Sequence, residues 1–167
     1  GSGMVMECKA AFQRMGDWAK GEFAAAWLKP DVDYYCAATP SDNGYLYNVD
    51  SFIFFKIKGQ DKVEGQKLLA SLMMGKNFQK VFNLYKGSIP ARLDVPMDDF
   101  DKCAKKSNAD LNTAAKKGGL LPSFAHGMTL ELGVKGAIQD VVTEHFNSNM
   151  SSQDAVKKLS AAVKAAS

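Results

Sequence analysis

Four polar or aromatic residues stand at the edges of expected helices and strands, where ligand-contacting residues are commonly found. They are Trp18, Asp50, Lys86 and His126. A tryptophan ring can pack against the apolar face of a sugar. A carboxylate, an ammonium group and an imidazole can exchange hydrogen bonds with hydroxyl groups. These residue types indicate a ligand cleft.

Each of the four also has a purely structural interpretation. Trp18 could be a core tryptophan, and Asp50 could be a strand-edge residue bonded to nearby backbone or to a lysine. Lys86 ends an expected helix, where the helix dipole favours a cation. His126 lies in a loop between two breaks and could simply be a surface residue. The residues by themselves leave both interpretations open.

Other chemistries lack the required spacing. The chain contains no HxxxH, no GxxxxGK[ST] and no GxGxxG after a strand, so we expect no metal site and no cofactor. Three cysteines, Cys8, Cys36 and Cys103, are too few for a disulfide scaffold. Either a Cys36–Cys103 bridge or three buried thiols would fit. Spacing neither supports nor excludes catalysis by a cysteine with His126 or His145.

The composition is that of one globular core. The chain has 167 residues, of which 46% are hydrophobic and 23% are charged, which excludes disorder and two large domains. The net charge of +3 gives no strong reason to expect nucleic acid or an anionic membrane as partner. No apolar run approaches the roughly 20 residues that cross a bilayer. The start, Gly1-Ser2-Gly3, is typical of a cloning remnant, so we expect the protein proper to be residues 4–167.

Hydrophobic periodicity predicts mainly helices, with strands in the first third of the chain. Asp17, Asp61 and Asn77 are expected helix N-caps, and Ser151 with Asp154 begins the last helix. A polar stretch at 98–117 should contain a few helical turns. We expect helices at 18–28, 61–75, 77–86, 130–145 and 151–166, and strands at 32–38, before a turn at 41–44, and within 45–57. The class is α/β or α+β with helix in excess.

Several local strings, in order along the chain, resemble the C-terminal part of the sugar-binding proteins of bacterial ABC importers. They are MGDWAKGEF at 15–23, NVDSF at 48–52, FQKVFNLYKGSIPAR at 78–92, FDKCA at 100–104, and the terminal helix pair. The similarity covers nearly the whole chain after Gly3. It is closest to the glucose- and mannose-type members of the family 1 extracellular solute-binding proteins.

The resemblance implies a fold and a site. The fold would be the helix-rich part of a two-lobe, type II periplasmic-binding-protein-like α/β fold. Residues 4–167 would supply most of one lobe, the hinge crossings and a piece of the other lobe. Trp18 would be the platform on which the pyranose ring stacks. Asp50 would accept bonds from sugar hydroxyls, Lys86 would donate to them, and His126 would be the fourth polar contact.

The resemblance also implies a setting for the protein. It would capture glucose or a related hexose, without catalysis, in the periplasm or tethered outside the cell. Its partners would be the sugar, the ABC transporter permease, and the N-terminal half of the receptor or a second chain. No nucleic acid is expected, and membrane contact would be made only through the permease. The alternative is a truncated relative that binds a partner or self-associates through exposed helical faces, and an enzyme is a third hypothesis.

Overall fold

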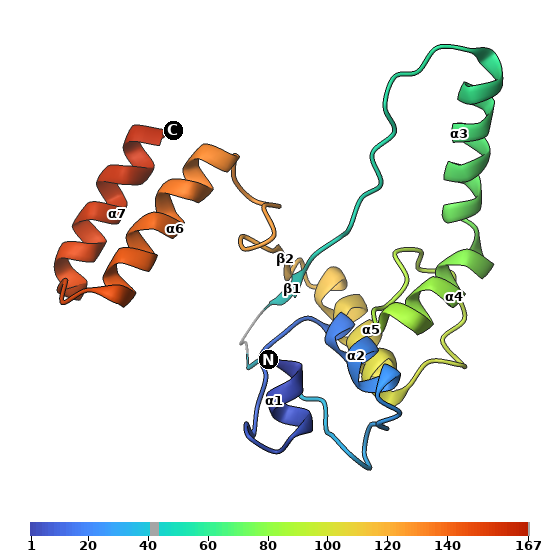
Figure 1. Ribbon diagram of the computed structural model, residues 1–167, viewed down its shortest axis with the longest axis horizontal. Coiled ribbons are helices and arrows are strands. Elements are labelled where there is room, and N and C mark those ends of the chain that lie inside the picture. The colour runs from blue at the N-terminus through green and yellow to red at the C-terminus, as the bar shows by residue number, and fades with distance from the viewer. Residues whose placement is uncertain (41–43, 167) are drawn as a thin grey trace. The chain divides into compact units, whose positions relative to one another are not determined.

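The computed structural model describes residues 1–40 and 44–166, and the chain divides into two compact units (Figure 1). We call them the first unit and the second unit. The first unit comprises Gly1–Tyr45 and Val49–Gly119, and the second comprises Leu46–Asn48 and Leu120–Ser167.

Helices make up most of the described structure. Before residue 100 the elements are α1 (Ser2–Met6), the 3-10 helix η1 (Asp17–Ala19), α2 (Lys20–Ala25), β1 (Tyr45–Tyr47), α3 (Gln60–Met73) and α4 (Lys76–Lys86). They are followed by α5 (Lys102–Lys116), β2 (Leu120–Pro122), α6 (Leu132–Asn147) and α7 (Ser152–Ala166). β1 pairs with β2: the Tyr45 N–H donates to Gly119 and the Ser123 N–H donates to Tyr47. This register makes the pair parallel, so the chain is helix-rich α/β.

The core of the first unit lies at the start of α5. Asp101 is the N-cap of this helix, and its carboxylate accepts a hydrogen bond of 2.7 Å from the Ala104 N–H. The cap satisfies a backbone donor that the helix leaves unpaired and fixes where the helix begins. It therefore places the flanking apolar side chains into one buried cluster, made of Val95, Phe100 and Ala104 with Ile89 and Met97 packed against it.

The second unit is built on an antiparallel pair of helices, α6 and α7. Val134 and Val141 of α6 and Ala155 of α7 are buried. Ser151 and Asp154 form the expected capping box: the Asp154 N–H donates to the Ser151 hydroxyl at 3.1 Å, and that hydroxyl donates to the Asp154 carboxylate at 2.7 Å. The expected terminal helix pair is confirmed.

Several expected helix boundaries are wrong. The expected N-caps make no side-chain cap hydrogen bond, because each N-cap position is held by a glycine one or two residues earlier: Gly16, Gly59 and Gly75. The helix expected at 18–28 is a short 3-10 turn followed by α2, which ends at Ala25. Residues Trp27 and Asp31 then take positive φ angles of 63° and 65°, which no helix can contain. Within 98–117, where a few helical turns are expected, residues Lys102–Lys116 form the helix α5, so this expectation is confirmed.

The expected strands are mostly wrong. Residues 32–38 form no strand, and a single bridge joins Pro30 to Tyr34. Of 45–57, only Tyr45–Tyr47 is a strand. A segment rich in residues that favour strands becomes a strand only where a second strand pairs with its backbone. Among the described residues, β2 is such a partner, and it pairs with β1 alone. The turn residues 41–43 lie outside the described residues.

A disulfide closes the first unit. Cys36 and Cys103 are bonded, with their Cα atoms 5.7 Å apart, while Cys8 is exposed and unbonded. The bridge is therefore confirmed, and the alternative of three buried thiols is wrong. It ties the segment after Pro30 to the first turn of α5. Among the described residues, no helix is long and apolar enough to cross a membrane.

Removing the disulfide should destabilise the first unit. The bridge joins residues 67 positions apart, and closing a loop of that length lowers the entropy of the unfolded chain, which corresponds to about 4 kcal/mol. The double variant Cys36→Ser/Cys103→Ser should lose about this much free energy of unfolding in urea titrations. Cys8→Ser is the control and should unfold like the parent. A double variant as stable as the parent would contradict the assignment.

Candidate functional site

The last turn of α4 carries the cation of the candidate site. Lys86 forms an ion pair with Asp50, 36 positions away in the sequence. Its side chain is 31% exposed and that of Asp50 is 61% exposed, so solvent reaches the pair. The structure thus brings two of the four selected residues together. The alternative interpretation of Asp50, as a purely structural residue bonded to a lysine, also predicts this ion pair.

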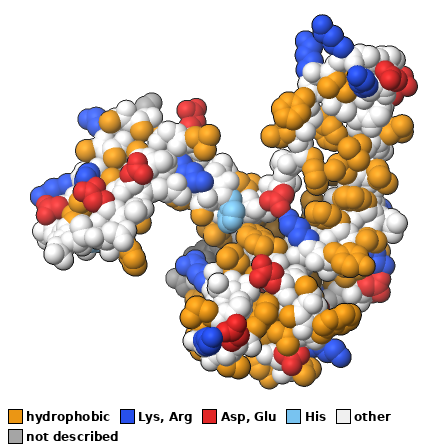
Figure 2. Space-filling view, viewed as in Figure 1, with side chains coloured by type: hydrophobic (Ala, Val, Ile, Leu, Met, Phe, Trp, Pro, Cys, Tyr) orange, Lys and Arg blue, Asp and Glu red, His pale blue; other side chains and the backbone are white. Residues whose placement is uncertain are grey.

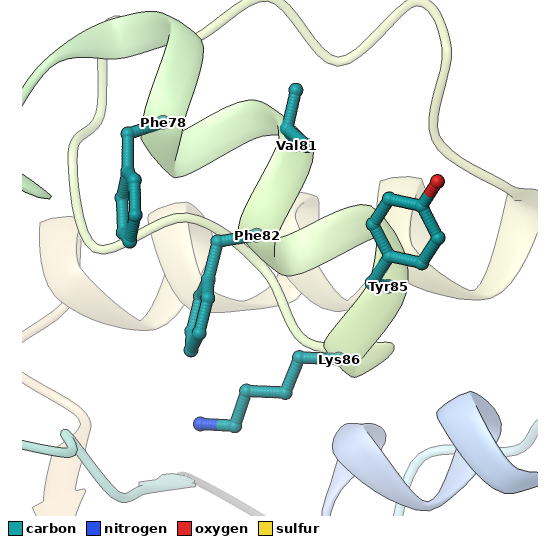
Figure 3. Close-up of a pocket in the computed structure, with 5 residues that line it drawn as sticks. All are labelled: Phe78, Val81, Phe82, Tyr85 and Lys86. Carbon is teal, nitrogen blue, oxygen red and sulfur yellow. The ribbon is translucent and has the colours of Figure 1, made fainter.

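Aromatic rings hold the Asp50 segment against α4. The rings of Phe78 and Phe82 stack with centroids 5.4 Å apart, and Phe52 meets Phe82 edge-on at 6.5 Å. The Lys86 ammonium lies 5.8 Å from the Phe82 centroid, within the range of a cation–π contact. Figure 3 shows the Phe78 and Phe82 rings on one side of α4, with the Lys86 side chain extending below Phe82.

A hollow of about 500 Å³ opens on this face of α4. Its lining is apolar apart from the Lys86 side chain and the Tyr85 hydroxyl, and it consists of Phe78, Val81, Phe82, Tyr85 and Lys86 (Figure 3). Tyr85 is 84% exposed, so the hollow is open to solvent. An apolar wall beside a single charged pair suits a molecule that has both an apolar face and hydroxyl groups.

The first turn of α2, directly after the turn that carries Trp18, lies against the end of α4. A Cβ atom on Gly21 would come within 2.6 Å of the Lys86 carbonyl oxygen, so the two backbones are in direct contact. Gly87 has a φ of 85° and would meet the backbone of Gly21 if it carried a Cβ. Trp18 lies three residues before Gly21, a chain distance of at most about 11 Å. Its ring folds back over Gly16, where a side chain would collide with it.

Two buried residues of α4 that the sequence analysis did not select hold the following loop. Asn83 accepts a hydrogen bond of 2.8 Å from the Ser88 hydroxyl, and Gln79 accepts one of 3.1 Å from the Ala91 N–H. The Asn83 amide also donates to the Gln79 carbonyl at 2.7 Å. Gln79 and Asn83 are four residues apart and therefore share one face of α4. In the sequence, this i, i+4 spacing of two polar side chains could have indicated that Gln79 and Asn83 act together.

A buried ion pair links α2 to α5. The Lys20 ammonium lies 2.9 and 3.1 Å from the two carboxylate oxygens of Asp101, and the side chains are 9% and 33% exposed. Lys20 directly precedes Gly21, so the pair fixes the backbone that touches Lys86. No local pattern indicates this pair, because the two partners are 81 positions apart in the chain.

Two further groups near the site have perturbed pKa values. Burial raises the pKa of Asp17 above its usual value, although the charge of Lys20 and hydrogen bonds from Ile89, Ser107 and Trp18 oppose the shift. Burial also raises the pKa of Tyr45, against a hydrogen bond with Ser107. At Asp17 the effect of burial on the pKa therefore outweighs these opposing contacts.

His126 belongs to the second unit. It is exposed, and its Nδ1 lies 2.7 Å from the hydroxyl of Ser123, which is 3% exposed. The Ala125 carbonyl, directly before the histidine, accepts a hydrogen bond from Lys135. Asp50 and Lys86 therefore meet within the first unit, and His126 belongs to the second. Among the described residues, no group of three or more His, Cys, Asp or Glu side chains is arranged to hold a metal ion.

Comparison with known proteins relates the chain to the binding proteins of transport systems. No protein-family model matches it. It is 51% identical over 166 residues to a probable sugar-binding periplasmic protein of Brucella suis, covering 99% of this chain and 39% of that protein. A probable sugar-binding periplasmic protein of Rhizobium meliloti is 48% identical over 166 residues, covering 99% and 40%. An uncharacterized ABC transporter extracellular-binding protein of Pyrococcus horikoshii is 34% identical over 141 residues, covering 84% and 31%.

The chain spans about two fifths of the length of the Brucella and Rhizobium relatives. The matched region is their C-terminal part. The resemblance to the C-terminal part of sugar-binding proteins of this kind is therefore confirmed.

Breaking the Lys20–Asp101 pair from its two ends should have unequal effects. Asp101→Asn keeps the α5 cap but removes the carboxylate that is bonded to the buried Lys20 ammonium, so it should lower the free energy of unfolding by about 3 kcal/mol. Lys20→Met leaves Asp101 partly exposed and capping α5, and should cost about 1 kcal/mol or less. Urea unfolding of both variants measures the difference. Equal losses would mean that the buried ammonium does not need its partner.

Proposed function

We propose that this chain is the sugar-binding C-terminal part of the receptor of an ABC importer. The observation that carries the proposal is the solvent-accessible Asp50–Lys86 pair beside an apolar wall, at the end of α4 that α2 touches. The names of the relatives support a sugar as ligand. The proposed activity is capture and release, with no bond broken in the sugar.

A hexose offers chemical groups that match this site. Its C–H faces are apolar and would stack on the Trp18 ring, while its hydroxyls would donate to Asp50 and accept from Lys86. In this structure these two side chains pair with each other. An exposed ion pair contributes only about 0–1 kcal/mol, so a hydroxyl can replace each partner at little cost. Glucose or a related hexose is the ligand we infer.

His126 is proposed as a fourth polar contact. The buried Ser123 hydroxyl holds the ring through Nδ1, which fixes the plane of the imidazole. An imidazole oriented in this way can exchange a hydrogen bond with a sugar hydroxyl.

The disulfide supports a location outside the cytoplasm. Structural disulfides persist in oxidising compartments such as the periplasm, and the Brucella and Rhizobium relatives are named periplasmic. We infer that the protein works in the periplasm or, membrane-tethered, at the cell surface. The proposed partner for delivery is the permease of the transporter, with no role for nucleic acid.

The large apolar surface supports completion by the rest of the receptor or by a second chain. Figure 2 shows hydrophobic side chains gathered along α3 and α4. Large side chains there and in the segment after β1 are more than 60% exposed, among them Ile53, Phe55, Leu68, Leu72 and Tyr85. Contiguous exposed apolar patches usually mark interaction surfaces. The same observation favours a second candidate function, an oligomerisation or interaction module without transport.

Sugar titration tests the proposed function. In a Trp27→Phe background, a panel of hexoses should change the fluorescence of Trp18, both in this chain and in a chimera where it replaces the matched part of the Brucella relative. Asp50→Ala or Lys86→Ala should weaken binding roughly tenfold to hundredfold, because a charged hydrogen bond to the sugar is lost.

The control for this titration is Glu144→Ala. It removes an exposed ion pair with Lys158 in the second unit and should leave binding unchanged. No response to any sugar, in the chain or the chimera, would rule out capture. If light scattering then showed that the chain self-associates as its concentration rises, with or without sugar, this result would support the interaction module.

A further inference from the structure

We propose that Gly21 and Gly87, because they carry no side chains, position Lys86 relative to the turn that carries Trp18. The proposal rests on the sugar-binding function proposed above and adds two positioning residues to it. Neither glycine would contact the sugar. Their role would be to let two backbone segments lie at a distance that any larger residue would increase.

The contact is between the backbone of α2 and the backbone at the end of α4. A Cβ atom on Gly21 would lie 2.6 Å from the Lys86 carbonyl oxygen, and one on Gly87 would collide with the Gly21 nitrogen. Cβ atoms in proteins essentially never come within 3.0 Å of such neighbours. Because the obstacles on both sides are backbone atoms, no side-chain rotation can relieve either collision.

The Trp18 turn and Gly21 belong to one continuous helical segment. The Lys20 N–H donates to the Asp17 carbonyl, so η1 runs directly into α2. The buried Lys20 ammonium lies 2.9 and 3.1 Å from the two carboxylate oxygens of Asp101, and this pair holds α2 to the start of α5. A shift of Gly21 would therefore be accompanied by a shift of Trp18.

The other segment is held by a buried residue of α4. The Gly87 N–H donates to the Asn83 carbonyl at 2.9 Å, and the Ser88 hydroxyl donates to the Asn83 side chain at 2.8 Å. Asn83 and Ser88 are both buried, where hydrogen bonds are stronger than in water. A Cβ atom at the contact could fit only if one segment moved against its own bonds. That movement would change the separation of Lys86 and Trp18.

Backbone conformation alone does not explain the two glycines. Gly87 has a φ of 85° and ends α4 in the left-handed conformation, a position that asparagine also occupies in other helices. Gly21 lies within α2 and has no positive φ. A glycine in such a position weakens a helix relative to alanine. The close approach of α4 is therefore the feature that requires glycine at position 21.

Two pairs of substitutions separate the contact from the other effects of replacing a glycine. Gly21→Ala adds a methyl group at the contact, and its control, Gly65→Ala, adds one to α3 where nothing lies within 4 Å. Gly87→Ala adds a methyl group and backbone strain. Its control, Gly118→Ala, adds similar strain at a φ of 69° with nothing within 4 Å. All are made in the Trp27→Phe background.

Gly87→Asn separates strain from contact at a single position. Asparagine tolerates the left-handed conformation better than alanine does, but it still places a Cβ atom against Gly21. If the contact matters, Gly87→Asn should lose sugar affinity although much of the backbone strain is relieved.

The readouts are sugar affinity in the chain and the chimera, and the emission maximum and acrylamide quenching of Trp18 without sugar. Gly21→Ala, Gly87→Ala and Gly87→Asn should each lose about tenfold or more in affinity, because a charged hydrogen bond to the sugar is lengthened or lost. They should also change the quenching of the indole. Gly65→Ala and Gly118→Ala should bind and fluoresce like the parent.

Urea unfolding of each variant separates positioning from a loss of stability. Partial unfolding lowers the apparent affinity only by the fraction of molecules that are not folded. A variant that is about nine-tenths folded would lose about a tenth of its affinity in this way. A tenfold loss in such a variant therefore reports a changed site. If Gly21→Ala does not fold, Gly87→Asn tests the same contact from the opposite segment.

Three outcomes would overturn the proposal. Parent-like binding and emission in folded Gly21→Ala would mean that the contact has no role in the site. Equal losses in Gly21→Ala and Gly65→Ala would mean that the effect is not specific to the contact. Parent-like binding in Gly87→Asn, with a loss in Gly87→Ala, would mean that Gly87 serves only the left-handed conformation.

Failure of the sugar-binding function is distinguishable from failure of this inference. If the parent binds no sugar, the proposed function fails. The sugar-free fluorescence of Trp18 then still tests the positioning role, because it compares Gly21→Ala with Gly65→Ala without any ligand.

Discussion

The candidate site depends on the contact between two glycines. The backbone of α2 at Gly21 lies against the backbone at the end of α4, and a side chain on Gly21 or Gly87 would collide with the other segment. Gly87 carries a second constraint, since its left-handed conformation ends α4. Two backbones at this distance cannot slide past each other. The direction in which Lys86 leaves its helix is therefore tied to the turn that carries Trp18.

Directional contacts, more than a large apolar core, hold the first unit together. Its buried apolar cluster is small, centred on Val95, Phe100 and Ala104. Around it lie the Cys36–Cys103 disulfide, the buried Lys20–Asp101 pair and the hydrogen bonds of Gln79 and Asn83. Apolar burial is non-directional, whereas hydrogen bonds and a covalent bridge specify distances and angles. Such a unit is suited to holding a few side chains in a defined arrangement.

The fold was predictable from sequence where short-range interactions decide it. The helical periodicity of α3, α4, α6 and α7 and the capping box of Ser151 and Asp154 involve residues within about one turn of each other. The strand predictions failed at 32–38 and over most of 45–57. A strand needs a partner from elsewhere in the chain, and apolar, β-branched residues do not show whether one is present. The N-cap predictions failed because glycines one or two residues earlier hold those positions.

For the candidate site, the sequence by itself determined which side chains are available. It supplied an indole after Gly16, a carboxylate among apolar residues, a lysine at a helix end and a histidine in a loop. The tertiary structure decided which of them meet. It paired Asp50 with Lys86 across 36 positions and Lys20 with Asp101 across 81, and it placed His126 in the second unit. Contacts between distant residues depend on how the whole chain closes its loops, a property that no local pattern records.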